Sequence, residues 1–443
     1  MSGKEYYSAV NLVQNPSFEK NRIGMPENWY KWSPRSELEP KVQARSDFSH
    51  SGQWSLWMSG EGKPACYGKL GQVIKGIVPG NSYRFKVYFR TLNVKSIRES
   101  VVVQLSWITE GSTEINMDYI NDLRKEGDWR TLEGIATAPQ KAESLEIELI
   151  FRWSEGSIWW DDVELIETLQ PECRKVKICT VHFRPKEPST VQRNIDLYTD
   201  LLDVAGRGRA DIVCLPECIT SVCVNKSIEE VAQPIPGPAT DRLSEKANKY
   251  KMYVVASLYE RAGSCIYNTA VLIDRNGRII GKYRKTHLPH GEIKSGVTPG
   301  SEYPVFETDF GKVGLEICYD IFFPEVTKIL ALKGAIMILL PIWGCWIQYG
   351  NESWYATARS RALDNSIYLV ASMYDGNSLI VGPDGGILAN SEGEEGVFFA
   401  ETELVDKGPP SVYVWPHVKK YEWRRMYPRD RRPETYSLLV EYE

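Results

Sequence analysis

Hydrophobic and polar residues alternate along several stretches in the first third of the chain. Tyr83, Phe85, Val87 and Phe89 alternate with Arg84, Lys86, Tyr88 and Arg90, and the stretch LEIELIFRW at 145–153 shows the same pattern. A period of two buries one face of a β-strand and leaves the other face in water. Several such strands, separated by turn signals such as VPGNS at 78–82, predict an antiparallel β-sandwich.

The pattern changes after ETLQPECRK at 167–175, which we interpret as containing a linker. From there, short continuous apolar runs typical of buried strands alternate with amphipathic stretches typical of helices. The first three are a strand at 175–183, a helix at 189–207 and a strand at 210–217. This alternation predicts a layered α/β domain. We therefore expect a β-sandwich over residues 1–168, a linker at 169–174 and a second domain over 175–443.

Composition agrees with two globular domains. At 443 residues the chain exceeds one ordinary core, and a 42% hydrophobic with 25% charged content is typical of water-soluble proteins. No apolar run approaches the roughly 20 residues of a membrane helix, and the N-terminus lacks the apolar segment of a secretory signal, so we expect a cytoplasmic protein without membrane contact. Nine scattered cysteines indicate reduced thiols, and a net charge of −5 argues against a nucleic-acid partner.

Three predicted strands of the second domain each end at a reactive side chain, namely Glu217, Lys285 and Cys318. Sites in layered α/β folds gather at the carboxyl ends of strands, so these residues are expected to converge. A helix starting near Pro324 and the charge of Lys285 would both favour a thiolate at Cys318. Glu217 could take the thiol proton and return it to a leaving amine. The chemistry predicted is acyl transfer through a thioester.

The motifs around these residues, LPE, YRKTHLP…E and CYDIFFPE, resemble the three signatures of the nitrilase (carbon–nitrogen hydrolase) superfamily. The resemblance implies an αββα sandwich that assembles into a homodimer or larger homo-oligomer. It implies Glu217 as general base, Cys318 as nucleophile, and Lys285 with the backbone N–H of Tyr319 as the oxyanion donors. Glu292 matches a second glutamate that positions the lysine and the substrate, although EIKSGVTPG is one residue longer than the usual spacing.

The first domain also resembles a known family. NPSFE, NWYKW, VPGNSYRFKVYFR, GDWRTLEG and SIWWDDVELIE are similar to carbohydrate-binding-module or galactose-binding-like jelly rolls. The resemblance implies a possible glycan ligand and a possible structural calcium, held by acidic residues that would here be Glu19 and Asp162.

Several side chains have a simpler structural interpretation. Four tryptophans of the sandwich could stack on sugars, namely Trp107, Trp153, Trp159 and Trp160. Core packing explains most of them, since Trp107 and Trp153 lie on the apolar phase of their strands. Asp161 and Asp162 are interpreted as a strand-end turn, and Asp364 in RALDN as structural. His287 and His290 are interpreted as support or substrate contacts.

Three cysteines of the second domain could be metal ligands, but burial as small apolar side chains is the stronger interpretation. Cys214, Cys218 and Cys223, with His182, could suggest zinc, but paired CxxC spacing is absent. We predict no metal in this domain and no required cofactor.

The resulting functional hypothesis is a hydrolase of amide or N-carbamoyl compounds that releases ammonia or an amine. Its alternatives are a nitrilase acting on a C≡N group, an acyltransferase, and a glycan-binding or scaffold protein with a vestigial hydrolase domain. The small-molecule substrate is therefore an amide, a ureido compound or a nitrile. Ile321 and Phe322 stand after the cysteine and are expected to form an apolar wall in place of an arginine. We therefore also expect a substrate without a carboxylate beside the scissile bond.

Overall fold

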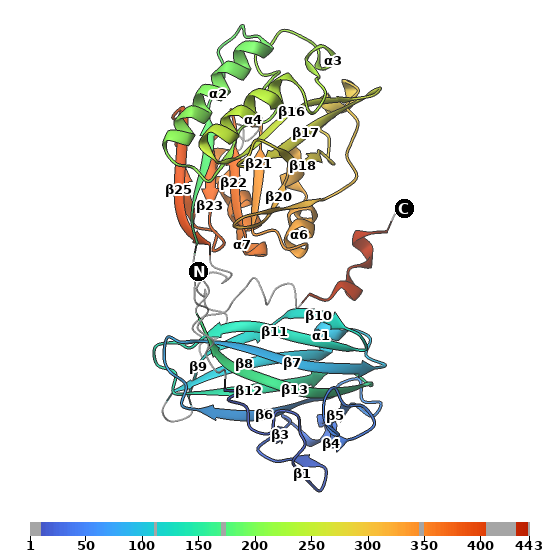
Figure 1. Cartoon of the computed structure of the whole chain (residues 1–443). Coiled ribbons are helices and arrows are strands. Elements are labelled where there is room, and N and C mark those ends of the chain that lie inside the picture. The colour runs from blue at the N-terminus through green and yellow to red at the C-terminus, as the bar shows by residue number, and fades with distance from the viewer. Residues whose placement is uncertain (1–9, 110–112, 170–173, 345–349, 405–430, 442–443) are drawn as a thin grey trace. The chain divides into compact units, whose positions relative to one another are not determined.

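The structure is a computed structural model, and it describes residues 10–109, 113–169, 174–344, 350–404 and 431–441. The described residues fall into two compact units: residues 10–169 and 431–441 belong to the first, and residues 174–404 belong to the second (Figure 1). Most of the predicted linker lies outside the described residues, so the exact domain boundaries stay predictions. Within the described ranges, no helix combines the length and apolar character needed to cross a membrane.

The first unit is built from two antiparallel sheets. One has six strands in the order β10-β11-β7-β13-β5-β4, and the other has five in the order β3-β6-β12-β8-β9. The strands are β3 (Tyr30–Trp32), β4 (Lys41–Arg45), β5 (Ser55–Ser59), β6 (Tyr67–Lys75), β7 (Ser82–Leu92), β8 (Val101–Thr109), β9 (Thr113–Ile120), β10 (Asp122–Glu126), β11 (Trp129–Thr137), β12 (Ser144–Arg152) and β13 (Ser157–Thr168). Smaller elements are β1 (Asn21–Arg22), β2 (Met25–Pro26), a 3-10 turn (Ser36–Leu38) and α1 (Ile97–Ser100).

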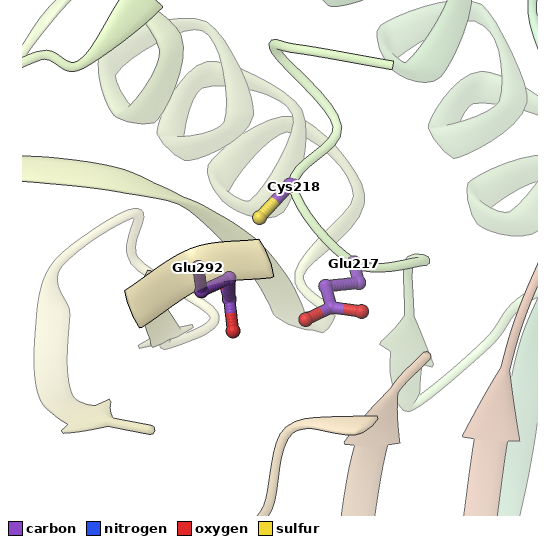
Figure 2. A group of neighbouring side chains, drawn as sticks. All are labelled: Glu217, Cys218 and Glu292. Carbon is purple, nitrogen blue, oxygen red and sulfur yellow. The ribbon is translucent and has the colours of Figure 1, made fainter. Parts of the chain in front are cut away.

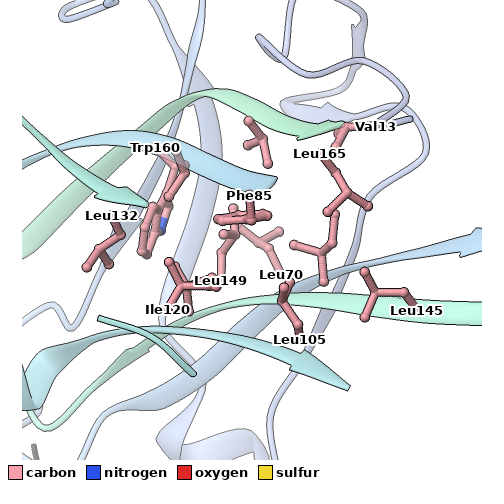
Figure 3. Packing of buried hydrophobic residues seen from close by; sticks show 14 of the residues in the cluster. Val13, Leu70, Phe85, Leu105, Ile120, Leu132, Leu145, Leu149, Trp160 and Leu165 are labelled. Atoms are coloured by element: carbon pink, nitrogen blue, oxygen red, sulfur yellow. The ribbon is translucent and has the colours of Figure 1, made fainter. Parts of the chain in front are cut away.

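The core of this unit lies between the two sheets (Figure 3). Phe85 of β7 and Leu149 of β12 are fully buried there, as the alternation predicted, and Trp160 of β13 is fully buried beside them. The expectation for Trp153 was wrong, because its side chain is 51% exposed. It follows the last residue of β12 in a left-handed conformation, with φ of 52°, which turns it away from the apolar phase.

The second unit contains two six-stranded sheets, β18-β17-β16-β15-β14-β25 and β19-β20-β21-β22-β23-β24. The first sheet is formed by β14 (Arg174–His182), β15 (Ile212–Cys214), β16 (Tyr253–Ala262), β17 (Cys265–Ile273), β18 (Ile279–Arg284) and β25 (Gly396–Leu404). The second is formed by β19 (Val305–Thr308), β20 (Gly311–Leu315), β21 (Met337–Pro341), β22 (Tyr368–Ser372), β23 (Leu379–Val381) and β24 (Ile387–Asn390). The helices of this unit are α2 (Val191–Arg207), α3 (Ile228–Val231), α4 (Pro238–Tyr250), α5 (His290–Lys294), the 3-10 helix η2 (Cys318–Phe322), α6 (Pro324–Leu332) and α7 (Gly350–Asn365). Two further 3-10 turns, Pro433–Thr435 and Ser437–Leu439, are assigned to the first unit.

Three separate apolar clusters define the layers of the second unit. Helices α2 and α4 pack on the first sheet through a cluster that includes Leu202 and Leu243. The two sheets pack on each other through a cluster that includes Val255 and Leu339, and α6 and α7 cover the second sheet through one that includes Leu330. The order helix, sheet, sheet, helix is the αββα sandwich, so the predicted fold class is confirmed for both parts of the chain.

Candidate active site

The three residues predicted to converge lie beside strand ends in the second unit. Lys285 directly follows β18, whereas Glu217 and Cys318 lie three residues beyond the last residues of β15 and β20. The two strands are therefore shorter than the sequence suggested. Two residues without regular structure follow each strand, after which Glu217 begins a turn and Cys318 begins η2. Lys285 is only 1% exposed, and its Nζ donates hydrogen bonds of 2.8 Å to Glu217 Oε1 and 2.8 Å to Glu292 Oε2.

Glu217 is held on both of its carboxylate oxygens. Oε1 accepts from Lys285, and Oε2 accepts from the backbone N–H of Trp343 at 2.8 Å, in the segment that follows β21. The hydroxyl of Tyr374 donates to the backbone carbonyl of Glu217 at 2.5 Å. The carboxylate thus has a fixed orientation, which a general base needs.

Cys318 is half-buried at the start of η2 and adopts a left-handed backbone conformation, with φ of 45°. Non-glycine residues in this conformation are uncommon and cluster at functional sites. Burial raises the pKa of the Cys318 thiol well above its ordinary value; the charge of Glu217 and a hydrogen bond with it act in the same direction, and Lys285 opposes them. The thiol is therefore protonated at neutral pH.

Two physical features oppose a thiolate at Cys318. Burial outweighs the ammonium group of Lys285. In addition, the α-helix begins at Pro324, which occupies its first turn as predicted, so only a five-residue 3-10 helix starts at Cys318. Attack by this thiol requires a base that removes its proton, and Glu217 is the neighbouring carboxylate.

Glu292 lies on α5, on the other side of the lysine from Glu217. Burial raises the pKa of the Glu292 carboxyl, and the charge of Lys285 counteracts this shift only in part. Burial alone would lower the pKa of Lys285, but the charges of both glutamates hold it well above its usual range. The ammonium group is therefore permanently charged between two carboxylates.

Sequence reasoning missed Asn268, a fully buried residue of β17 that donates to Glu217 Oε1 at 2.8 Å and to Glu292 Oε1 at 2.7 Å. The available signal was a single amide inside the apolar run CIYNTAVLI. Buried amides need partners, so such a residue indicates a polar neighbour.

Asp320 connects the loop after Lys285 to the turn that carries Cys318. Its buried carboxylate accepts hydrogen bonds from the backbone N–H of His287 at 3.0 Å and of Ile317 at 3.1 Å, and from the hydroxyl of Tyr283 at 2.8 Å. The ring of His287 also contacts Asp320, at 2.9 Å. His287 therefore has a supporting position, whereas His290 is exposed at the start of α5.

Within the described ranges, one group of three side chains has the spacing of metal ligands, and it consists of Glu217, Cys218 and Glu292 (Figure 2). The ammonium group of Lys285 already bonds to both carboxylates, and burial raises the pKa of the Cys218 thiol well above its ordinary value. A protonated thiol and two occupied carboxylates fit a lysine pocket better than a zinc site. Cys214, Cys223 and His182 do not belong to the group, and the absence of a metal stays a prediction.

The two residues expected at a calcium site accept hydrogen bonds from their own domain. Glu19 Oε1 accepts from the backbone N–H groups of Gln53 and Trp54 at 2.9 Å each. Asp162 Oδ1 accepts from the hydroxyls of Ser17 and Ser51 at 2.6 Å each. No group of three potential metal ligands forms around either residue in the part of the chain that the structure describes. Calcium binding stays a prediction.

The interpretation of Asp161 and Asp162 as a strand-end turn was wrong. Both lie inside β13, at a β-bulge where the register with β7 shifts. The bulge places Asp161 in the interior, where burial raises the pKa of its carboxyl to about 7.

Comparison with known proteins assigns a family to each of the two parts of the chain. Residues 175–408 match the family model of carbon-nitrogen hydrolases, and residues 10–156 match that of a carbohydrate binding domain. Omega-amidase NIT2 of Bos taurus is 32% identical over 236 residues, which cover 49% of this chain and 85% of that protein. The Schizosaccharomyces pombe protein named "Probable nitrilase C965.09" is 33% identical over 285 residues, covering 60% of this chain and 99% of that protein.

Among solved structures, an amidase from Nesterenkonia sp. has the same fold, with a TM-score of 0.50 and 23% identity over 61% of this chain and 99% of the amidase. The family model matches more than half of the residues, and two relatives exceed 30% identity over most of their own length. The chain belongs to the carbon-nitrogen hydrolase family, and its N-terminal part matches the carbohydrate binding domain.

Proposed function

We propose that this protein is an amidase-type hydrolase that forms a thioester at Cys318. The observation that carries the proposal is the Lys285 ammonium group, which bonds at 2.8 Å to each of two buried glutamates beside a protonated thiol. An ordinary core would not bury three ionisable side chains in this way without a functional reason. Membership in the carbon-nitrogen hydrolase family and similarity to a protein named omega-amidase support the same conclusion.

The proposed reaction proceeds in two halves. Glu217 takes the proton of the Cys318 thiol while the sulfur attacks the carbonyl carbon of the amide. The oxyanion that forms is stabilised by Lys285 and by the backbone N–H of Tyr319, because an ammonium group has three donors and the glutamates use two. Glu217 then gives its proton to the leaving nitrogen, which departs as ammonia or an amine. In the second half, Glu217 removes a proton from water, which attacks the thioester and releases the acid and the thiol.

A matched set of primary amides, N-carbamoyl amines and nitriles tests this function. We expect ammonia and an acid from the amides, at rates at least tenfold above those of the nitriles. Intact-mass measurement after rapid quenching should show an acyl adduct on Cys318. Faster conversion of the nitriles would favour the nitrilase alternative, and amine-dependent transfer of the acyl group would favour an acyltransferase. Adduct formation on a different residue would overturn the proposed mechanism.

The substrate is proposed to lack a carboxylate beside the scissile bond. The expectation that both Ile321 and Phe322 form an apolar wall needs correction, because Ile321 is 1% exposed and packs in the core under α6 and α7. Phe322 is 41% exposed and its ring contacts Tyr319 at 5.5 Å. The neutral surface at this turn therefore comes from two aromatic rings, which offer an unpaired carboxylate no compensating charge.

We expect a primary amide to exceed its carboxylate-bearing counterpart at least tenfold in kcat/KM. The variant Phe322→Arg should reduce or reverse that preference, because arginine can bind a carboxylate with two hydrogen bonds. Phe322→Leu serves as the matched neutral control and should keep the original preference. A tenfold preference of the unaltered protein for the acid would contradict the proposal.

A second function, glycan binding by the first unit, is favoured by one surface in addition to the family match. The outer face of the five-stranded sheet carries Trp32, which is 48% exposed, beside Tyr67. Lys69 lies over the Trp32 ring at 5.4 Å and bonds to Glu146 at 2.6 Å and Glu148 at 3.1 Å. Exposed aromatic rings next to ordered polar groups suit the faces and hydroxyls of sugars. The four tryptophans considered from the sequence do not include Trp32.

Titration with soluble polysaccharides and oligosaccharides tests this surface. Trp32→Ala should weaken glycan binding at least tenfold. The control Leu123→Ala, an exposed residue of β10 in the other sheet, should leave it unchanged. Equal binding by both variants would show that this face is not the glycan site.

A further inference from the structure

Asn268 forms hydrogen bonds with all three charged residues of the site, Glu217, Lys285 and Glu292. It lies in β17 opposite Tyr259 of β16, and its backbone carbonyl accepts a hydrogen bond of 2.9 Å from the backbone N–H of Lys285. Its side chain contacts both glutamates that surround the lysine ammonium group. One residue thus holds the lysine through its backbone and the glutamates through its side chain.

A chain of donors fixes the orientation of the Asn268 amide. The backbone N–H of Cys218 donates to Ser257 Oγ at 3.1 Å, and the Ser257 hydroxyl donates to Asn268 Oδ1 at 2.8 Å. Because the hydroxyl donates to it, Oδ1 is an acceptor, and the NH₂ group must face the two carboxylates. Both hydrogens of that group are then used, one for each glutamate.

The charges explain what this amide contributes. Two carboxylates in a dry pocket repel each other, and a single ammonium group neutralises only one of them. The NH₂ group of Asn268 supplies a second source of positive partial charge, directed at Glu217 Oε1 and Glu292 Oε1. It adds no net charge and cannot be protonated, so its effect does not change with pH.

We propose that Asn268 is a positioning residue that holds Glu217 and Glu292 in place around Lys285, so that Glu217 is oriented to accept the thiol proton of Cys318. This inference rests on the proposed hydrolase function. Without the Asn268 amide, the pKa of the Glu292 carboxyl would rise further, because the hydrogen bond from Asn268 is one of the interactions that lower this pKa. Protonation of Glu292 would then remove one of the two carboxylates that orient the lysine.

The test uses the full chain with p-nitrophenyl acetate, which acylates a reactive thiol and releases coloured nitrophenolate. The acylation rate is measured between pH 5 and pH 9, and mass analysis of proteolytic peptides identifies the acylated residue. For Asn268→Leu we expect a 10- to 100-fold slower acylation at pH 7, with the acid limb of the profile moved to higher pH by about one unit. A lost hydrogen-bond donor favours the protonated carboxyl, which gives the shift this direction.

In Asn268→Asp the new side chain has nearly the same shape as asparagine, but the variant should lose acylation on the alkaline side of the pH profile. The new carboxyl can donate to one glutamate only while it is protonated, so acylation should persist at low pH and fall as pH rises. Asn194→Leu is the matched control, because Asn194 is another fully buried amide of the second unit, which donates to the Val222 carbonyl at 2.8 Å and lies outside the site. Its profile should keep the shape of the unaltered protein.

The possible results distinguish failure of the proposed hydrolase function from failure of the proposed role of Asn268. If the unaltered protein is not acylated at Cys318, the proposed function fails. If it is acylated but both Asn268 variants only scale the profile at every pH, as a purely structural residue would, the inference about Asn268 is wrong. Asn268→Asp keeps the test decisive if Asn268→Leu does not fold.

Discussion

Cys318→Ala is expected to lower amide turnover by about 10⁴-fold or more while the protein stays folded. The sulfur is the atom that forms the thioester in the proposed mechanism, and removing a nucleophile from a group that acts as a unit removes nearly all of its contribution. The side chain is small and half-buried, so little packing is lost. The measurements are kcat on the best amide, the mass of the quenched enzyme, which should show no adduct, and the melting temperature.

Cys265→Ala provides the matched control, because Cys265 is another half-exposed free thiol of the second unit, at the start of β17. It should retain its activity and still acquire the acyl adduct. Retention of more than a few percent of activity by Cys318→Ala would mean that another group attacks the substrate.

The sequence allowed the prediction of the main side chains because each stands in a short local motif. Glu217 and Cys318 follow apolar runs and Lys285 follows a predicted strand, and their convergence follows from the rule that sites gather at the carboxyl ends of strands. The alternation around Phe85 likewise predicted which face of β7 is buried. These inferences depend only on neighbours in the sequence.

The remaining features depend on contacts between distant segments. Asn268 becomes informative only when β17 places it between Glu217 and Glu292, which are 51 and 24 residues away. The protonated state of Cys318 follows from burial by several elements, whereas local motifs suggested a thiolate. Trp153 is exposed because its own backbone adopts a left-handed conformation, and the alternation of apolar and polar residues does not reveal such a conformation.

Lys285→Met is expected to reduce both stability and activity, because it leaves two buried carboxylates facing each other without their shared cation. Removing one partner from a buried ion pair costs about 3–5 kcal/mol of unfolding free energy. Turnover should fall by about 10³-fold or more, since the proposed oxyanion donor and the group that orients Glu217 are lost together. Urea unfolding and kcat on the best amide measure the two effects.

Lys282→Met is the matched control, since Lys282 is a lysine of the same strand, β18, that pairs with Glu260 and keeps 40% of its side chain exposed. We expect it to change stability by less than about 1 kcal/mol, because the buried Glu260 keeps both of its hydrogen bonds with Arg284, and to leave turnover unchanged. A Lys285→Met protein as stable and active as this control would contradict the role of the buried lysine.

The destabilisation by Lys285→Met should also depend on pH, with a sign set by Glu292. Burial already raises the pKa of this carboxyl in the folded protein, and loss of the ammonium group would raise it further. A carboxyl whose folded pKa lies above its unfolded pKa stabilises the fold while it is protonated and loses that contribution as pH rises through the folded value. The stability of the variant should therefore be closest to that of the unaltered protein near pH 5 and furthest from it near pH 8.

Adding Glu292→Gln to Lys285→Met should restore most of the stability at pH 8, because one buried charge disappears. It should restore none of the turnover, because no cation faces the oxyanion. Recovery of turnover in the double variant would show that Lys285 serves only the fold.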